Sequence, residues 1–393
     1  MKLTLKTDVA IIGSGPSGLL LSRLLKLKGI SSVIVERQSI THVLSRIRAG
    51  VLEQGSVNMM RRAEVGTRVS SEGLRHDGFQ ITYGDRELRI DLQKLMGKGV
   101  TVYGQTEVTK DLYHAVISDN TQIIENAGDD TAITLSSDHV KVTGVSPECA
   151  FDIEAKFVAG CDGYRGISRQ AIPVDIRQEF ERIYPFGWLG VLSETKPADH
   201  EIIYSSHENG FAMCSMRNAN LSRYYVQCPT NDRTDDWSDE RFWATLKERL
   251  PSQIAQSLEI GPSIEKSIAP LRSFVCEPLS HQRIFIAGDA GHIVPPTGAK
   301  GLNLAFSDIF YLSNALVQYF SKNDESELTG YSDRALARIW KAERFSWWMT
   351  SLLHKFDEED RFAEKMRRAE FQFLCESPDF QRALAENYVG LPY

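Results

Sequence analysis

The hydrophobic and polar positions of the first 36 residues predict a β-α-β unit. Residues 8–12 form a short apolar run, which is typical of a buried parallel strand. Residues 19–28 are rich in Leu, Lys and Arg and end at Gly29, which predicts a helix. Residues 33–35 predict a second strand that ends at Glu36. The chain therefore opens as the start of a parallel α/β sheet.

The pattern changes further along the chain. Alternating apolar and polar residues predict short antiparallel strands, then a separate aromatic- and Gly-rich sheet, a helix, a buried strand and a helical last part. In chain order, these segments are residues 131–160, 184–227, 235–250, 283–287 and 311–393, the last with a long amphipathic stretch at 335–356. The chain shows no repeats, and its 393 residues are enough for two or three domains.

The loop between the first strand and the first helix carries Gly13, Gly15 and Gly18 in the spacing of a dinucleotide-binding turn. Glycines allow a pyrophosphate to approach the backbone, and the helix N-terminus offers free N–H groups to phosphates. Glu36, at the end of the second strand, can accept hydrogen bonds from a ribose. The alternative is a Gly-rich turn without a ligand, and the loop alone does not distinguish NAD from FAD.

Composition narrows the classes of function. The net charge of −7 argues against nucleic acid as a partner, because phosphate binding needs clustered Lys and Arg. The six cysteines are scattered, without metal-ligand spacing, so we expect reduced thiols and no metal. The N-terminus lacks the features of a signal peptide, and no run reaches the ~18 apolar residues that span a bilayer. We therefore expect a cytoplasmic protein without a membrane partner.

Two later motifs complete a resemblance. Asp162-Gly163 and Gly288-Asp289 resemble two motifs of the single-component FAD-dependent aromatic hydroxylases. Longer runs resemble this family over nearly the whole chain: residues 46–54, 102–107, 184–190, 267–274, 340–348 and 386–392. The resemblance implies an α/β fold with a discontinuous, Rossmann-like FAD-binding domain, an inserted β-rich substrate domain and a helical C-terminal region. We predict the ranges 1–180 and 271–310 for FAD binding, 181–270 for the substrate and 311–393 for the helices.

The resemblance also implies an activity. It predicts hydroxylation of 4-hydroxybenzoate to 3,4-dihydroxybenzoate with NAD(P)H and O₂, through a flavin hydroperoxide, in a homodimer. NADPH is favoured as the reductant, and NADH stays an alternative, because His42 and Arg165 stand where some NADPH users carry Tyr and His. Hydroxylation of another aromatic acid, and an FAD-dependent reductase without oxygen transfer, are the rival hypotheses.

Site residues follow from the same resemblance. Those implied to bind FAD are Gly13, Gly15, Gly18, Glu36, Arg46, Arg48, Gln105, Arg223, Asp289, Leu302 and Asn303. Those implied to hold the nicotinamide cofactor are Arg37, Arg46, Arg165 and Arg272. Those implied to bind the substrate are Tyr204, Ser215, Arg217, Tyr225 and Pro296, and those implied in catalysis are Tyr204, Tyr388, His76 and Pro296.

The implied chemistry needs a path for a proton. A phenolate activates its ring more strongly than a phenol, so the substrate's proton must leave while the ring stays dry. A chain Tyr204–Tyr388–His76 would supply the path, with His76 near solvent.

Each of these side chains also has a purely structural interpretation. The tyrosines could be core residues, while Arg217 and His76 could be surface residues. Asn303 could be the N-cap of a helix from Leu304.

Overall fold

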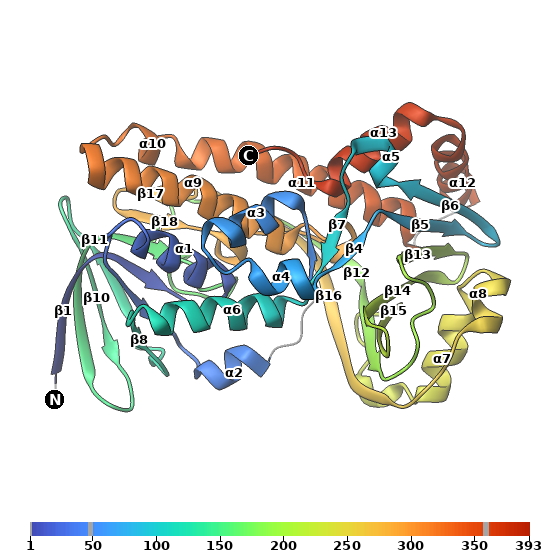
Figure 1. Cartoon of the computed structure of the whole chain (residues 1–393), viewed down its shortest axis with the longest axis horizontal. Helices are drawn as coiled ribbons and strands as arrows, with labels where there is room; N and C mark the ends of the chain where they lie inside the picture. Colours follow the sequence, from blue (N-terminus) through green and yellow to red (C-terminus); the bar gives the residue numbers. More distant parts are fainter. Residues whose placement is uncertain (1, 46–49, 357–360) are drawn as a thin grey trace.

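The computed structural model describes residues 2–45, 50–356 and 361–393 (Figure 1). The predicted β-α-β unit forms the middle of the first sheet. Strand β1 (Lys2–Ile12) leads into helix α1 (Pro16–Lys26), which returns the chain to β2 (Ser32–Val35). The two strands pair in parallel, with Ile12 opposite Val35. The last four residues of β1 are buried, as an apolar run with both faces covered requires.

Strands from distant parts of the chain extend this sheet. On its other side β1 pairs in parallel with β11 (Ala150–Gly160), and β11 pairs in parallel with β18 (Ile284–Ile286). The order is β17-β18-β11-β1-β2-β8, with β10 and β9 added through β11. The remaining bounds are β8 Gln122–Ile124, β9 Ala132–Leu135, β10 Val140–Val145 and β17 Ser280–His281. The discontinuous α/β fold predicted from the sequence is confirmed.

A second sheet holds the aromatic segment. Its order is β19-β16-β12-β15-β14-β13-β5-β6. The bounds are β5 Gly78–Tyr83, β6 Arg86–Asp91, β12 Gln178–Ser193, β13 Ile202–His207, β14 Gly210–Asn218, β15 Leu221–Pro229, β16 Ser263–Glu277 and β19 His292–Ile293. Strands β5 and β6 thus belong to this sheet, although they lie inside the range 1–180 that we predicted for FAD binding. The long strands β12 and β16 pair with each other and reach toward the first sheet (Figure 1).

Helices pack around both sheets. Among the described residues they are α2 Ile40–Ser45, α3 Gln54–Arg62, α4 Thr67–Glu72, α5 Leu92–Met96, α6 Gln105–Ser118, α7 Asp239–Glu248, α8 Ser252–Ser257, α9 Gly301–Lys322, α10 Ser326–Thr329, α11 Tyr331–Leu353, α12 Arg361–Glu376 and α13 Pro378–Val389. Helix α11 contacts α9 beside the first sheet and β13 and β16 of the second (Figure 1). A small sheet, β3 (Val51–Leu52), β7 (Val100–Val102) and β4 (Leu74–His76), completes the described strands.

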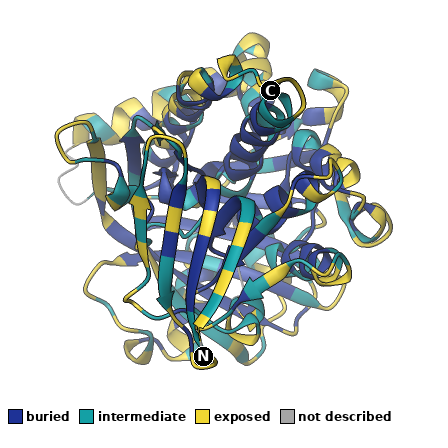
Figure 2. Ribbon diagram, turned by 90° about the vertical axis from the view of Figure 1, so that its left-hand side faces the viewer, coloured by how far each residue is buried: buried dark blue, intermediate teal, exposed yellow. Residues whose placement is uncertain are grey.

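The core follows these layers. Figure 2 shows exposed residues on the outer strand ends and loops, and buried residues where helices cover the first sheet. One apolar cluster lies around the first sheet, and two others lie on the faces of the second sheet. None of the helices described is long and apolar enough to span a bilayer.

Candidate functional site

A cavity of about 830 Å³ lies between the first and second sheets. Its volume is in the range of sites for cofactors and small ligands. One end is lined by the turns that follow β1 and β2, and the other end by strands of the second sheet. The predicted residues on its wall are Gly13, Gly15, Glu36, Arg37, Gln105, Arg165, Tyr204, Ser215, Arg217, Arg223, Tyr225, Asp289, Pro296 and Leu302. One cavity therefore joins the dinucleotide turn to the aromatic sheet.

The glycine turn has the shape that phosphate binding needs. Gly13 has φ +99°, and a Cβ there would lie 2.4 Å from the Cys161 carbonyl oxygen. A Cβ on Gly18 would lie 2.0 Å from the Gly13 carbonyl oxygen, so helix and strand pack too closely for a side chain. A Cβ on Gly15 would meet nothing within 4 Å, so the backbone at the N-terminus of α1 is open to the cavity. Gly18 thus shapes the turn without lining the cavity.

Glu36 stands beside this turn and is buried. Its Oε2 accepts hydrogen bonds from the Ser14 backbone N–H (2.7 Å) and the Ser14 hydroxyl (2.8 Å). Its Oε1 accepts one from the Gln38 N–H (2.8 Å). The carboxylate is therefore held rigidly at the cavity wall.

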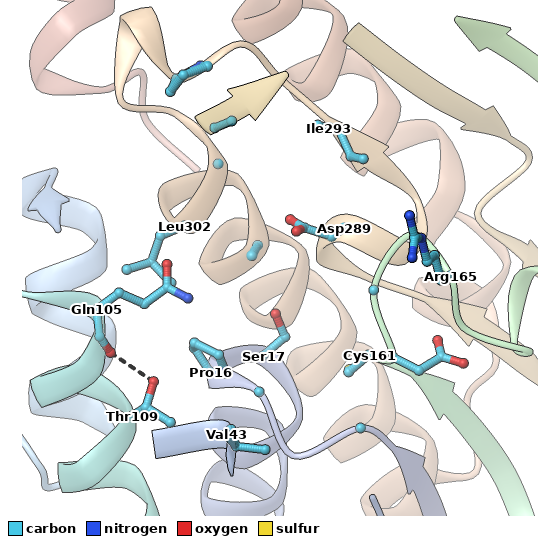
Figure 3. Close-up of a pocket in the computed structure, with 18 of the residues that line it drawn as sticks. Pro16, Ser17, Val43, Gln105, Thr109, Cys161, Arg165, Asp289, Ile293 and Leu302 are labelled. Atoms are coloured by element: carbon cyan, nitrogen blue, oxygen red, sulfur yellow. Dashed lines mark hydrogen bonds between the residues drawn. The ribbon is translucent and has the colours of Figure 1, made fainter. Parts of the chain in front are cut away.

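Two more turns reach the cavity because parallel strands end at the same edge of a sheet. The turn after β11 brings Cys161 and Arg165, and the turn after β18 brings Asp289 (Figure 3). The buried carboxylate of Asp308 holds the second turn: its Oδ2 accepts from the Gly288 N–H (2.9 Å) and lies 2.6 Å from His292 Nε2. The three motifs found in the sequence thus converge on one cavity.

The strand pairing of the second sheet brings together the residues that line the other end of the cavity. Tyr204 of β13 pairs with Met213 of β14, which pairs with Tyr225 of β15. Paired residues share a face of a sheet, and so do residues two apart, which adds Ser215 and Arg217 of β14. All five line the cavity. The sheet therefore presents hydroxyl groups and the Arg217 guanidinium, with Arg223 beside it, to a mainly apolar chamber.

Among the described residues, Arg217 is a cation of this chamber that has no acidic partner. No acidic side chain of the described ranges forms an ion pair with it, whereas Arg223 pairs with Glu265 (2.9 Å) and Ser267 (2.9 Å). Burial lowers the pKa of Arg217, Tyr225 opposes this effect and the neighbouring Arg223 adds to it. A cation held without a carboxylate partner is suited to bind an anion.

The two tyrosines of the predicted proton path are in direct contact. The Tyr204 and Tyr388 hydroxyl oxygens lie 2.9 Å apart, and Tyr388 lies behind Tyr204, off the cavity wall. Burial raises the pKa of Tyr204 to about 12, and the hydrogen bond with Tyr388 opposes this effect. Both hydroxyls therefore stay protonated near neutrality and can each accept one proton while passing on another.

His76 does not lie where we predicted. Its exposed fraction is 0%, so it is not at the surface, because the loop before β13 covers the end of β4 with His200. Neither ring nitrogen has a hydrogen-bond partner among the described residues. Burial, together with the adjacent His200, lowers its pKa to about 4.

This burial predicts a pH-dependent stability. His76 has a folded-state pKa of about 4, below the ordinary value of 6.5. As pH falls below 6.5 the unfolded chain binds a proton that the folded chain still excludes, so the free energy of unfolding should fall, by about 3 kcal/mol at pH 4. Urea unfolding between pH 7 and 4 should show a shallower fall for His76→Gln than for the natural chain. Parallel curves would contradict the assignment.

A buried charge cluster lies near the cavity and was not predicted from the sequence. Lys300 Nζ lies 2.6 Å from Glu53 Oε1, and Arg338 lies 3.1 Å from Glu53 Oε2. Lys300 lines the cavity, and burial lowers its pKa while Glu53 opposes this effect. Glu53 lies in the run 46–54, but nothing in a single sequence indicates that it meets Lys300.

Asn303 is fully engaged within the protein. Its Oδ1 accepts from the Glu53 N–H (2.9 Å) and the Ser56 hydroxyl (2.6 Å), and its Nδ2 donates to the carbonyls of Val51 and Ala299. Helix α9 begins at Gly301, so the suggested role of Asn303 as N-cap is wrong. The preceding backbone is already helical at Lys300, which moves the cap upstream.

The remaining predicted residues lie off the wall or outside the described structure. Arg272 does not line the cavity; it packs 4.6 Å from the Tyr164 ring centroid and pairs with Glu181 (3.1 Å). Arg46 and Arg48 lie outside the described residues.

Comparison with known proteins decides the family. A family model described as an FAD binding domain matches residues 6–346. The p-hydroxybenzoate hydroxylase of Acinetobacter baylyi is 52% identical over 398 aligned positions, which cover 99% of this chain and 96% of that protein. The rifampicin monooxygenase of Streptomyces venezuelae is 23% identical and is matched over 68% of its length. The chain belongs to the family of FAD-binding aromatic hydroxylases.

Solved structures agree on the fold of this family. The p-nitrophenol 4-monooxygenase of Pseudomonas putida DLL-E4 superposes with a TM-score of 0.82 at 16% identity, over the full length of both chains. The cofactor is FAD, as the sequence predicted, and the cavity fits it. The open backbone of Gly15 suits the pyrophosphate, Glu36 the adenosine ribose and Asp289 the ribityl chain. Which side chains hold each part of FAD stays a prediction.

Proposed function

We propose that this hydroxylase converts 4-hydroxybenzoate, O₂, NAD(P)H and a proton into 3,4-dihydroxybenzoate, water and NAD(P)⁺. The observation that carries the proposal is that one cavity presents both Arg217, which has no carboxylate partner among the described residues, and Tyr204, whose hydroxyl contacts that of Tyr388 behind the wall. A para-hydroxylated aromatic acid has an anionic carboxylate end and a phenolic end, which match these two groups. The 52% identity to a p-hydroxybenzoate hydroxylase supports the same substrate.

Each group has a role in this proposal. When bound, FAD would supply the redox chemistry, which is hydride acceptance from NAD(P)H and activation of O₂. Arg217, with Ser215 and Tyr225, holds the substrate carboxylate. Tyr204 receives the phenolic proton as its own passes to Tyr388, which leaves the ring electron-rich.

The chamber itself protects the reaction. Trp188, Ile202 and Met213 line the inner end beside Tyr204, so the ring lies among apolar groups. Excluding water there prevents reducing equivalents from being lost to peroxide. Pro296 lies on the same wall, which supports the prediction that its carbonyl positions the phenol.

Substrate-stimulated turnover tests the function. We expect 4-hydroxybenzoate to accelerate NADPH oxidation by the purified, FAD-loaded protein, with consumption of O₂ and formation of 3,4-dihydroxybenzoate. NADH in parallel decides the donor, to which Arg37 and Arg165 on the cavity wall would bind. Benzoate, which lacks the phenol, is the matched control. NADPH oxidation without O₂ consumption would indicate a reductase, and a preference for another aromatic acid would reassign the substrate.

We also propose a cytoplasmic homodimer. The described cysteines are free thiols, in keeping with a reducing compartment. Helix α12 exposes Phe362, Met366 and Phe373, each more than half accessible, which is typical of an interface. Light scattering on the purified protein would test the dimer.

A further inference from the structure

The predicted proton path ends at a residue that cannot reach water. His76 closes strand β4 with an exposed fraction of 0%, and neither of its ring nitrogens has a partner among the described residues. Burying an imidazole with two unpartnered nitrogens costs free energy, and such a group often marks a functional site. A path to solvent therefore needs one more group outside His76.

His200 occupies this outer position. Its ring centroid lies 5.3 Å from that of His76, with the planes inclined by 45°. In contrast to His76, His200 is exposed, and it stands in the loop immediately before β13, the strand that carries Tyr204. We propose that His200 is the outermost group of the proton path and exchanges protons between His76 and bulk water. The inference rests on the proposed function, because it needs a phenolic substrate that ionises in the chamber.

The charges around His76 and His200 support a role for His76 in passing protons on. Burial and His200 disfavour the protonated form of His76, while Glu201, Asp199 and Asp77 oppose them. Arg89 pairs with Glu201 (2.7 Å) and Arg75 with Asp77 (2.7 Å), which partly neutralises these carboxylates. With a pKa of about 4, His76 holds an added proton only briefly at neutral pH. Such a group passes protons on and does not store them.

The inner side of the path comes from the same neighbourhood. Tyr388 stacks on Phe79 of β5 (4.0 Å between ring centroids), and β5 follows His76 after one intervening residue. Burial raises the pKa of Tyr388, and Tyr204 and Glu201 add to this effect. Glu201 thus acts on both Tyr388 and His76.

The proton balance is simple. The substrate's phenolic proton goes to the Tyr204 oxygen as the Tyr204 proton goes to Tyr388. The proton that Tyr388 releases enters His76 at one ring nitrogen as the other nitrogen releases one toward His200. His200 gives one proton to water, so one proton leaves for each phenolate formed.

A pH jump with the FAD-loaded protein tests this role. After a jump from pH 6 to pH 8, the ultraviolet absorbance of bound 4-hydroxybenzoate reports phenolate formation. We expect His200→Gln and His200→Asn to slow this step by about tenfold or more, and added imidazole buffer to restore it. His114→Gln, which changes an exposed histidine of α6 away from the cavity wall, should leave the rate unchanged.

The outcomes separate the hypotheses. Natural rates in both His200 variants would overturn the inference. A slow step that imidazole does not restore would also overturn it, because it would show that His200 only packs against His76. If the natural protein binds 4-hydroxybenzoate without forming any phenolate, the proposed function itself fails, and the inference with it.

Discussion

Replacing Arg217 by alanine should weaken the binding of 4-hydroxybenzoate by about 2–4 kcal/mol, or about two orders of magnitude in Kd. The guanidinium lines the cavity without a carboxylate partner in the described structure, so its charge is available to the substrate's own carboxylate. Arg223 cannot replace it, because Glu265 and Ser267 already hold that side chain. Titration of the FAD-loaded protein, followed by the flavin absorbance change, measures the affinity.

Two further variants sharpen this prediction. Arg217→Lys keeps the charge but loses the planar fork that binds both carboxylate oxygens, so we expect an intermediate loss. Arg86→Ala removes an exposed arginine from β6 of the same sheet and should leave the affinity unchanged. An unchanged Kd in Arg217→Ala would remove this residue from the substrate site.

The glycine turn, and the Asp162 and Asp289 motifs by family resemblance, were enough to predict the cofactor end of the site. The turn Gly13–Gly18 and the Asp162 and Asp289 turns each follow a strand of the first sheet. Parallel strands bring such turns to one edge, so their meeting follows from topology alone. The structure confirms that all three lie at one cavity.

The substrate end depends on pairings that no local pattern contains. Strand β5 joins the second sheet by pairing in parallel with β13, so Phe79 lies opposite Ile202. This pairing brings β4 and His76 beside the loop of His200 and buries a histidine that we predicted near solvent. Burial of a polar residue is decided by what folds over it.

The charge cluster illustrates the same limit. Glu53, Lys300 and Arg338 come from α3's N-terminus, the loop before α9 and the middle of α11. Taken alone, each of these residues is of a charged type that usually lies at the solvated surface. Their contact therefore could not be predicted from the sequence pattern.

Replacing Tyr204 by phenylalanine should lower the hydroxylation rate about 100-fold or more while changing substrate affinity far less. The Tyr204 hydroxyl contacts Tyr388 (2.9 Å). Its loss therefore interrupts the proton path at the first transfer. The ring keeps its packing against Phe79 and Phe211. Rapid quenching of single turnovers, with 3,4-dihydroxybenzoate quantified, separates this rate from NADPH oxidation.

Tyr224→Phe is the matched control for this experiment. Tyr224 is as buried as Tyr204, but it packs against Trp243 of α7 in the apolar cluster on the opposite face of the second sheet. The control should retain the natural hydroxylation rate. In Tyr204→Phe, the amount of 3,4-dihydroxybenzoate formed per NADPH oxidised should fall, because a phenol that keeps its proton reacts more slowly than a phenolate. An unchanged single-turnover rate and an unchanged product yield in Tyr204→Phe would show that the tyrosine pair is not the route by which the substrate ionises.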